Sequence, residues 1–450
     1  MSLPPAWLAK PIRRLFDNAH IRRVVKNTGY LFGTTGISAG LSIIQGILAA
    51  RVLGVYGYGL LGSVMMFASV INNFASFRMG ELVVKYVGEY SETGDKTHAA
   101  AIFKLSALTE MLASIAAFIL ILLLAPLGAR YFAKDALTTN LFVIYGLIVL
   151  ANLIAESSTG LLQIFDRFRV IAGYNLAQSA LTLALTAVVY IMHGNLLGVL
   201  VAYLVGKALS ALGLTLAALV QATRHWDAGW WRAPLRILRP QYGELIRFAI
   251  STNISGSLSL ITKDSELLWV SYIRTPLEAG YYKLALSLAY LVQMPVSPMP
   301  QTTYPELSRQ VARRDWLGVR ILLRQGALLA GVYTLAATLG LALIGKPLIR
   351  LLYTADFLPA YPALVILLVG YLFANTFYWR RVALLSLGQP GYPAKLNAIL
   401  AVFKVIGILV LVPRYGYLAS AALLTAFYIL GSILSVQKTY SLLPAQSEIR

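Results

Sequence analysis

Hydrophobic runs of bilayer length recur along this chain from end to end, and they restrict its fold more than any other feature. A transmembrane helix needs about 20 predominantly apolar residues, and this chain of 450 residues is 58% hydrophobic and only 12% charged. Soluble domains carry about twice that share of charge. We therefore predict an all-α, polytopic membrane protein. Twelve spans are expected, near 29–50, 57–80, 100–125, 138–163, 168–192, 195–222, 246–272, 279–305, 321–345, 360–386, 394–413 and 416–437.

The positions of the basic residues test this topology, because Lys and Arg collect in cytoplasmic segments of membrane proteins. If the N-terminus is cytoplasmic, most of the 38 Lys and Arg residues fall in inner segments. The outer segments hold only Arg51, Arg130, Lys134, Arg274, Lys346, Arg350 and Arg414. A missed or extra helix would scramble this alternation, so we expect twelve spans with both termini cytoplasmic. The formal charge of +20 then indicates membrane lipids as partners, and no nucleic acid.

The twelve spans divide into two six-helix lobes. A basic segment, residues 1–28, precedes the N-lobe at 29–222, and it either lies on the inner membrane surface or forms a disordered tail. A cytoplasmic connection at 223–245, rich in Trp and Arg, leads to the C-lobe at 246–437. Residues 438–450 form a C-terminal tail.

The two lobes also resemble each other in sequence. Residues 35–45 and 252–262 are identical at six of eleven aligned positions, and Gly57-Tyr58-Gly59 has a counterpart in Gly280-Tyr281-Tyr282. Six spans per lobe mean that both lobes enter the membrane in the same direction. The repeat is therefore parallel, with a pseudo-twofold axis along the membrane normal. Chance similarity between apolar helices is the alternative explanation.

Polar side chains form a stripe on one helical face of the first span, and the stripe includes Ser42 and Gln45. The seventh span repeats it with Ser259 and its neighbours. Small polar residues also serve simple helix packing, but an isolated charge in hydrocarbon costs ~2.5–3.5 kcal/mol. Three charges lie deep in the seventh span, namely Lys263, Asp264 and Glu266. We therefore expect spans one and seven to line a shared central cavity.

Cations outnumber acids among the charges embedded in the spans. The cations are Lys207, Lys263, Lys283, Arg380, Arg381 and Lys404, and the acids are Glu110, Glu156, Asp264 and Glu266. A basic cavity suits an anion such as phosphate, which arginine binds with a planar fork and lysine as a point charge. Arg380 and Arg381 are the favoured contacts, because their own span has no nearby acid.

Two alternatives remain open for these embedded charges. The first is internal ion pairing, for example Lys263 with Glu266 or Lys207 with Glu156. The second applies to the two adjacent arginines, whose long side chains can reach toward the inner membrane surface. The four acids are also candidates for binding a coupling ion, H⁺ or Na⁺.

Several features that indicate catalysis are missing. The chain has no cysteine and no Walker A sequence, and its four histidines lie at span ends or in loops without forming a metal-ligand pair. We therefore expect no metal, no cofactor and no enzymatic activity. The eighth span contains Pro295, Pro298 and Pro300, which remove backbone donors and kink a helix. Such a kink fits either a hinge beside a cavity or a static packing feature.

Three sequence segments carry a family resemblance. They are Asn27 to Gly59 with Ala50-Arg51-Val52-Leu53-Gly54, Thr262-Lys263-Asp264 followed by Ala279 to Ala285, and Tyr304 to Arg309. With these loose patterns the chain resembles the oligosaccharide (O-antigen and polysaccharide) flippases of the multidrug/oligosaccharidyl-lipid/polysaccharide (MOP) exporter superfamily. The resemblance covers nearly the whole chain.

The resemblance implies a secondary transporter in the cell inner membrane. It would move a polyprenyl-diphosphate-linked oligosaccharide to the outer leaflet by alternating access, for use by a polysaccharide polymerase or other assembly proteins. Efflux of small amphiphiles, as in multidrug antiporters of the superfamily, is an alternative that drug susceptibility of a deletion strain would reveal. A membrane glycan polymerase is another, and it would change the length or linkage of the lipid-linked glycan.

Overall fold

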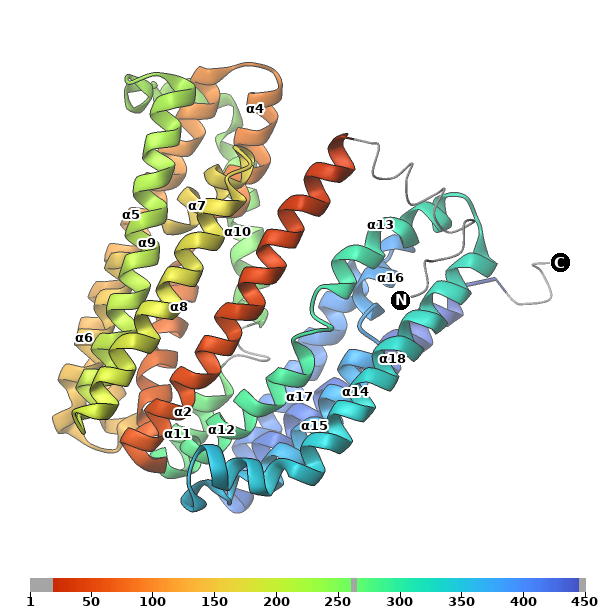
Figure 1. Ribbon diagram of the computed structural model, residues 1–450. Coiled ribbons are helices and arrows are strands. Elements are labelled where there is room, and N and C mark those ends of the chain that lie inside the picture. Colours follow the sequence, from red (N-terminus) through yellow and green to blue (C-terminus); the bar gives the residue numbers. More distant parts are fainter. Residues whose placement is uncertain (1–18, 260–264, 445–450) are drawn as a thin grey trace, which may run out of the picture. The chain divides into compact units, whose positions relative to one another are not determined.

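The computed structural model describes residues 19–259 and 265–444, and this part of the chain is built from helices (Figure 1). Within it, nine helical segments are long and apolar enough to cross a membrane. The all-α, multi-pass prediction is confirmed. The first half contains α2 (Ala19–Ala75), α3 (Met79–Leu82), a π-helix (Val83–Val87), α4 (Gly88–Glu92), α5 (Lys96–Gly128), a second π-helix (Ala129–Ala133), α6 (Thr139–Ala151), α7 (Ala155–Ile164), α8 (Phe168–Ile191) and α9 (Leu196–Trp226).

The second half follows two short 3₁₀ turns, Trp230–Arg232 and Leu235–Gln241, which lie in the predicted connection. Its helices are α10 (Tyr242–Ser259), α11 (Glu266–Ile273), α12 (Pro276–Gln293), α13 (Met299–Ala312), α14 (Trp316–Leu352), α15 (Ala360–Thr376), α16 (Arg380–Ser386), α17 (Gly391–Tyr415) and α18 (Tyr417–Ser441). The last helix therefore runs a few residues into the predicted tail.

These elements account for the twelve predicted spans. The long helix α2 contains two spans, because Gly54 has non-helical angles (φ 64°, ψ −176°) that kink it in the middle. A left-handed φ is accessible to glycine at no steric cost. The described residues of the seventh span lie in α10 and α11, and residues 260–264 between them are outside the described part of the chain. The eighth is divided between α12 and α13 by the turn that contains Pro295 and Pro298, so the predicted irregularity of this span is confirmed.

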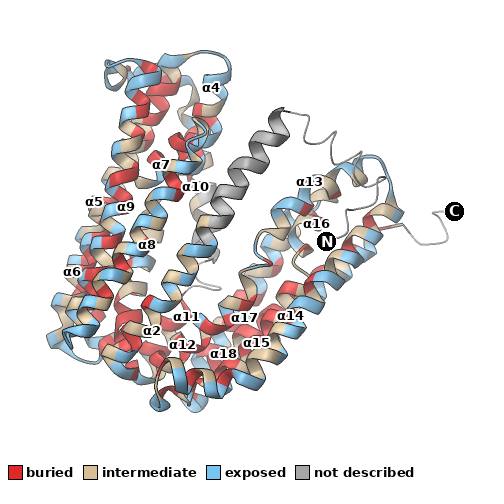
Figure 2. Cartoon of the chain, viewed as in Figure 1, coloured by how far each residue is buried: buried red, intermediate tan, exposed pale blue. Residues whose placement is uncertain are grey.

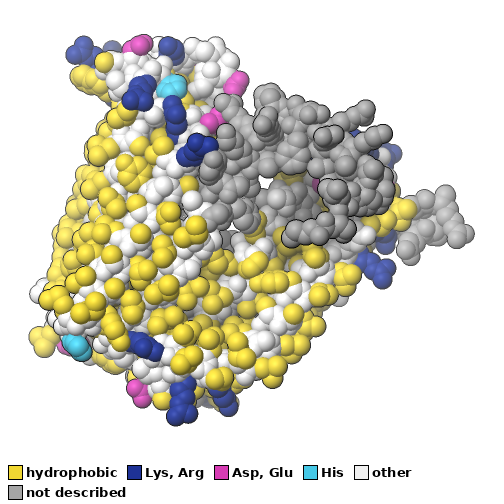
Figure 3. Space-filling model, in the orientation of Figure 1, with side chains coloured by type: hydrophobic (Ala, Val, Ile, Leu, Met, Phe, Trp, Pro, Cys, Tyr) yellow, Lys and Arg dark blue, Asp and Glu magenta, His cyan; other side chains and the backbone are white. Residues whose placement is uncertain are grey.

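Large hydrophobic side chains cover the outer surfaces of many helices. Leu112 and Leu123 on α5 and Leu329 and Leu343 on α14 are strongly exposed, Leu343 by 80%. On the face seen in Figure 3 hydrophobic side chains predominate, and the visible cations gather near helix ends. A soluble protein does not expose such continuous apolar surface. These surfaces therefore face lipid.

The chain divides into two compact units. Unit 1 comprises residues 1–52, 71–125 and 140–256, and unit 2 comprises 53–70, 126–139 and 257–450. Unit 2 thus includes two segments of the first half. The predicted lobes, 29–222 and 246–437, are defined by the order of the spans along the chain, whereas the two units are defined by spatial contacts. The lobe boundaries therefore stay a prediction.

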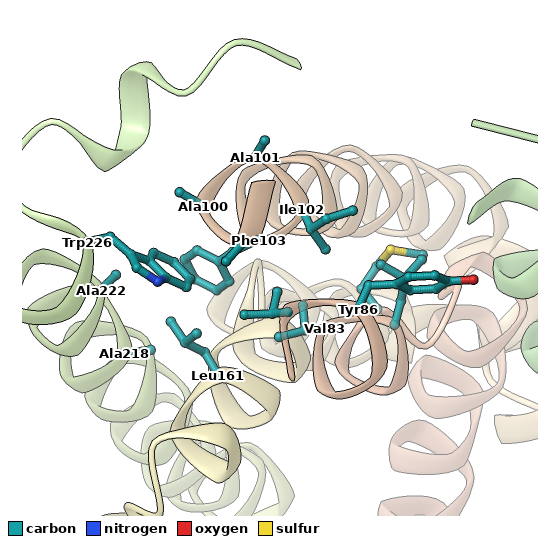
Figure 4. Packing of buried hydrophobic residues seen from close by; sticks show 14 of the residues in the cluster. Val83, Tyr86, Ala100, Ala101, Ile102, Phe103, Leu161, Ala218, Ala222 and Trp226 are labelled. Carbon is teal, nitrogen blue, oxygen red and sulfur yellow. The ribbon is translucent and has the colours of Figure 1, made fainter. Parts of the chain in front are cut away.

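Unit 1 has an aromatic and aliphatic core at one end of its helices. Phe103 packs against Trp226 with ring centroids 5.8 Å apart, and Val83, Tyr86 and Leu161 lie in the same cluster (Figure 4). In unit 2, buried residues line the inner faces of the helices (Figure 2). Its cores include a cluster around Leu323 and Trp379 and a smaller one around Ile408. Burial of these side chains stabilises each unit.

Candidate functional site

Unit 1 contains a polar cavity of about 830 Å³. Two helix interruptions border it. The first separates α2 from α3, where Arg78 has a left-handed backbone (φ 50°), and the second separates α6 from α7 at residues 152–154. Irregular backbone at membrane depth is tolerated where it lines a cavity. The interruptions bring polar side chains from α2, α3, α5 and α7 to one wall.

Glu110 on α5 is buried in this wall, and its carboxylate holds the start of α7. It accepts hydrogen bonds from the backbone N–H groups of Glu156 (2.8 Å) and Ser157 (2.9 Å) and from the Ser157 hydroxyl (2.6 Å). The first N–H groups of a helix have no partner within the helix, and they carry partial positive charge. A carboxylate from another helix satisfies both needs. Within the described part of the chain no cation pairs with Glu110.

Glu156, the first-turn acid of α7, is exposed toward the cavity, and the Ser76 hydroxyl lies 3.3 Å from one of its carboxylate oxygens. The alternative pairing of Lys207 with Glu156 is not found among the described residues. Lys207 has an exposed side chain on α9 and does not line the cavity. The structure therefore brings together Glu110 and Glu156, two of the predicted ion-binding acids, and leaves Lys207 apart from them.

Two glycines set the spacing of the cavity wall. A Cβ atom at Gly80 would lie 2.8 Å from the Glu156 carbonyl oxygen, and one at Gly160 would lie 2.7 Å from the Gly80 carbonyl oxygen. Only glycine permits so close an approach of α3 and α7. This contact fixes the start of α7 where Glu110 can reach it.

Several cavity residues were missed by sequence reasoning. Arg78, Glu81 and Lys85 look like ordinary cytoplasmic charges, because the sequence does not show that the second span ends in a break. Side-chain amides were missed as well, namely Asn72, Asn73, Asn152 and Gln163. Their occurrence inside apolar spans was the available signal, since amides are costly in lipid unless they are satisfied.

Unit 2 contains a second, smaller cavity of about 380 Å³. Arg380 lines it together with Asn375, Gln293 and four tyrosines, which are Tyr290, Tyr371, Tyr378 and Tyr428. The Arg380 guanidinium donates to the Ser432 hydroxyl and, at 3.5 Å, to the Tyr428 carbonyl. Within the described residues these are its hydrogen-bond partners, and both are uncharged. Arg381 has an exposed side chain and does not line this cavity.

Two other embedded cations of unit 2, Lys404 and Lys283, have internal partners. Lys404 is buried and forms an ion pair with the buried Glu266, which also accepts from the Tyr282 hydroxyl. Glu266 therefore forms an internal ion pair, as one alternative predicted, but its partner is Lys404. The alternative had named Lys263. The Lys283 ammonium lies 4.0 Å from the centroid of the Tyr58 ring and donates to the Tyr58 carbonyl at 3.2 Å.

The polar stripe of the first span serves packing at one position at least. The Gln45 amide is buried and donates to the Ser179 carbonyl on α8 (2.6 Å), whereas Ser42 is exposed and bonds to the Ser38 carbonyl of its own helix. Lys263, Asp264 and the side chain of Ser259 lie outside the described residues. The predicted lining of a central cavity by spans one and seven therefore stays a prediction.

A charged cluster lies where the unit 1 cavity meets the connection between the two halves of the chain. Lys85 pairs with Glu244 at 3.6 Å, and Arg78 pairs with Glu81 at 3.2 Å. The Tyr86 hydroxyl donates to Glu244 at 2.7 Å, and this hydrogen bond holds the pKa of the Glu244 carboxyl below its usual value. Both cations of the cavity wall are thus already paired with carboxylates.

Solved structures of transporters share this fold. The chain aligns with an inward-facing multidrug resistance transporter of the MATE family of the MOP superfamily with a TM-score of 0.72, at 15% identity over 90% of this chain and 95% of that one. It aligns with the lipid II flippase MurJ in an inward closed conformation with a TM-score of 0.70, at 16% identity over 91% of this chain and 87% of that one. The fold class is therefore the two-lobe, twelve-helix architecture of MOP-type proteins.

Sequence comparison identifies the family. Residues 24–311 match the polysaccharide biosynthesis protein family, and the chain belongs to it. The chain is also 23% identical to the inner membrane protein YghQ of Escherichia coli (strain K12), over 78% of this chain and 98% of that protein. The predicted resemblance to this family is confirmed.

Proposed function

We propose that this protein is a flippase that moves a polyprenyl-diphosphate-linked oligosaccharide from the inner to the outer leaflet by alternating access. The observation that carries the proposal is Arg380, a guanidinium at membrane depth in a tyrosine-lined cavity whose hydrogen bonds go to uncharged groups. A charge in such a place costs several kcal/mol unless it is compensated. An incoming diphosphate would supply the compensating charge, and a guanidinium binds phosphate oxygens bidentately.

Support for this substrate also comes from relatives. The family is one of polysaccharide biosynthesis, and the structurally similar MurJ is a flippase of lipid II. We place the protein in the inner membrane, where YghQ is named as residing, with both termini in the cytoplasm. A polysaccharide polymerase or other assembly proteins would take up the translocated product. Efflux of cationic drugs is disfavoured, because Arg380 would repel them.

The test is translocation of a fluorescent polyprenyl-diphosphate oligosaccharide in proteoliposomes, with leaflet position read by membrane-impermeant quenching. Arg380→Ala should slow translocation about 10- to 100-fold, the loss expected for a hydrogen bond to a charged group. Arg380→Lys should retain part of the rate. Arg381→Ala is a matched control, since its side chain points away from the cavity, and it should translocate at the wild-type rate.

Two results would contradict the proposal at different levels. A wild-type protein that leaves the fluorescent lipid in its original leaflet is not a flippase for this substrate class. A flippase that is indifferent to Arg380→Ala binds the diphosphate elsewhere.

We also propose that Glu110 takes the coupling ion, H⁺ or Na⁺. Of the described acids at membrane depth, Glu266 is neutralised by Lys404, whereas Glu110 is held by N–H and O–H donors and borders the unit 1 cavity. A carboxylate without a fixed cation can gain and lose an ion during a cycle. Loss of the requirement for an ion gradient in Glu110→Gln tests this assignment.

A further inference from the structure

The charges of the unit 1 cavity do not suit an anion. Two cations line it, Arg78 and Lys85, and each already pairs with a carboxylate. Three carboxylates line it as well, from Glu81, Glu110 and Glu156. A diphosphate entering this cavity would meet like charge without an unpaired cation to offset it. The cavity therefore does not suit an anionic ligand.

The same wall offers hydrogen-bonding groups that the fold does not use. The side-chain amides of Asn72, Asn152 and Gln163 make no hydrogen bond to other described residues, yet all three line the cavity. An amide presents both a carbonyl acceptor and NH₂ donors. A sugar hydroxyl is likewise both donor and acceptor, so neighbouring hydroxyls of a pyranose match such amides. Phe248 adds an aromatic surface to the wall.

Volume agrees with this chemistry. About 830 Å³ is within the range of pockets that hold drug-sized ligands, roughly 300–1,000 Å³, and it accommodates a short oligosaccharide. The unit 2 cavity differs in volume and in charge, since it is smaller and has an arginine with uncharged partners.

We propose that the unit 1 cavity is a glycan subsite that binds uncharged sugar units through side-chain amides and rejects anionic sugars. The assignment rests on the proposed function, because it takes the glycan of the proposed substrate as the ligand of this cavity. It predicts a selectivity that the family alone does not imply. Repeat units rich in uronic acids should be poor ligands, whereas neutral hexoses should be accepted.

The test uses the full-length protein in lipid nanodiscs and probes that contain neither lipid nor phosphate. Saturation-transfer NMR would measure binding of maltotriose, which is neutral, and of trigalacturonic acid, which carries three carboxylates. We expect maltotriose to bind and trigalacturonic acid to bind at least about tenfold more weakly. The double variant Asn72→Leu/Gln163→Leu should weaken maltotriose binding about tenfold, since each net hydrogen bond contributes a few-fold in affinity.

The variants are chosen so that a loss of folding is not mistaken for a loss of maltotriose binding. Asn72 and Gln163 lie on helices, where the helix propensity of leucine exceeds that of asparagine and about equals that of glutamine. Gln389→Leu removes an exposed amide outside the cavity and should bind maltotriose as the wild type does. Equal binding of the two probes, or unchanged maltotriose binding in the double variant, would overturn the subsite.

The outcome is separable from that of the flippase proposal. Arg380→Ala should keep maltotriose binding while translocating about 10- to 100-fold more slowly. Amide-dependent maltotriose binding in a protein that fails to translocate the lipid-linked substrate would leave the subsite standing and the flippase function rejected. Translocation without amide-dependent binding would reject the subsite alone.

Discussion

Two buried carboxylates, Glu110 in unit 1 and Glu266 in unit 2, are compensated for the loss of hydration in different ways. Glu266 is compensated by a full charge, the Lys404 ammonium, and by the Tyr282 hydroxyl. Glu110 is compensated by two backbone N–H groups and one hydroxyl at the start of α7. The first arrangement is a closed ion pair. The second leaves a negative charge supported only by dipoles beside a polar cavity.

The difference indicates different roles for the two units. A buried ion pair fixes two helices to each other, and breaking it leaves an uncompensated charge. The Glu110 carboxylate is held by neutral N–H and O–H donors, so no cation among the described residues neutralises its charge. A proton or a sodium ion can therefore bind it. We therefore propose that the Glu266 site serves structural cohesion and that the Glu110 site serves ion coupling.

The largest expected effect is at the ion pair. Lys404→Met should destabilise the protein by about 3–5 kcal/mol, because Glu266 is then left buried without its cation. Thermal unfolding in detergent would measure the loss. Lys404→Met/Glu266→Gln should recover much of the stability, since no charge is left unpaired. A single variant as stable as the wild type would mean that the pair contributes no cohesion.

An intermediate effect is expected at Glu110. Glu110→Gln keeps the shape but replaces a charged acceptor by a neutral one, and it should cost about 1–3 kcal/mol of stability. Unlike the variants at Glu266, it should also make translocation independent of an imposed ion gradient. Proteoliposome assays with and without a pH or sodium gradient would measure this. If Glu110→Gln still responds to both gradients, the coupling site lies elsewhere.

The smallest effect is expected at a third carboxylate, which caps a helix at the membrane surface. Asp95 accepts from the backbone N–H of His98 (3.0 Å) at the start of α5, and this hydrogen bond lowers the pKa of Asp95. Asp95→Ala should cost about 1 kcal/mol, as for other helix caps.

The Asp95 contribution should depend on pH in a defined direction. A lowered folded-state pKa means that the stabilisation is complete above the unfolded-state value of about 4. It is lost as the pH falls through the lower, folded-state value. Unfolding of wild type and Asp95→Ala between pH 3 and 7 should therefore show stabilities that converge at the acid end. A difference that stays constant over this range would contradict the assignment.

Much of the fold could be predicted because its determinants are local. Each span is recognisable from its own residues, and the prolines of the eighth span predicted that this helix is interrupted. The site was predicted only in part. Arg380 and the acids Glu110 and Glu156 were identified as embedded charges, whereas the separation of Arg381 from its neighbour Arg380 depended on which helix face each one occupies.

The sequence by itself determined that this chain crosses the membrane repeatedly, since hydrophobic run length and charge asymmetry act over one helix at a time. Its motifs also place it in the polysaccharide biosynthesis protein family. Only the tertiary structure decided which embedded charges are already satisfied. Lys404 and Glu266 belong to different spans, and Glu110 meets the start of α7 because Gly80 and Gly160 let two backbones approach. Compensation of a buried charge depends on distances of a few ångströms between distant segments, and no local pattern in the chain records them.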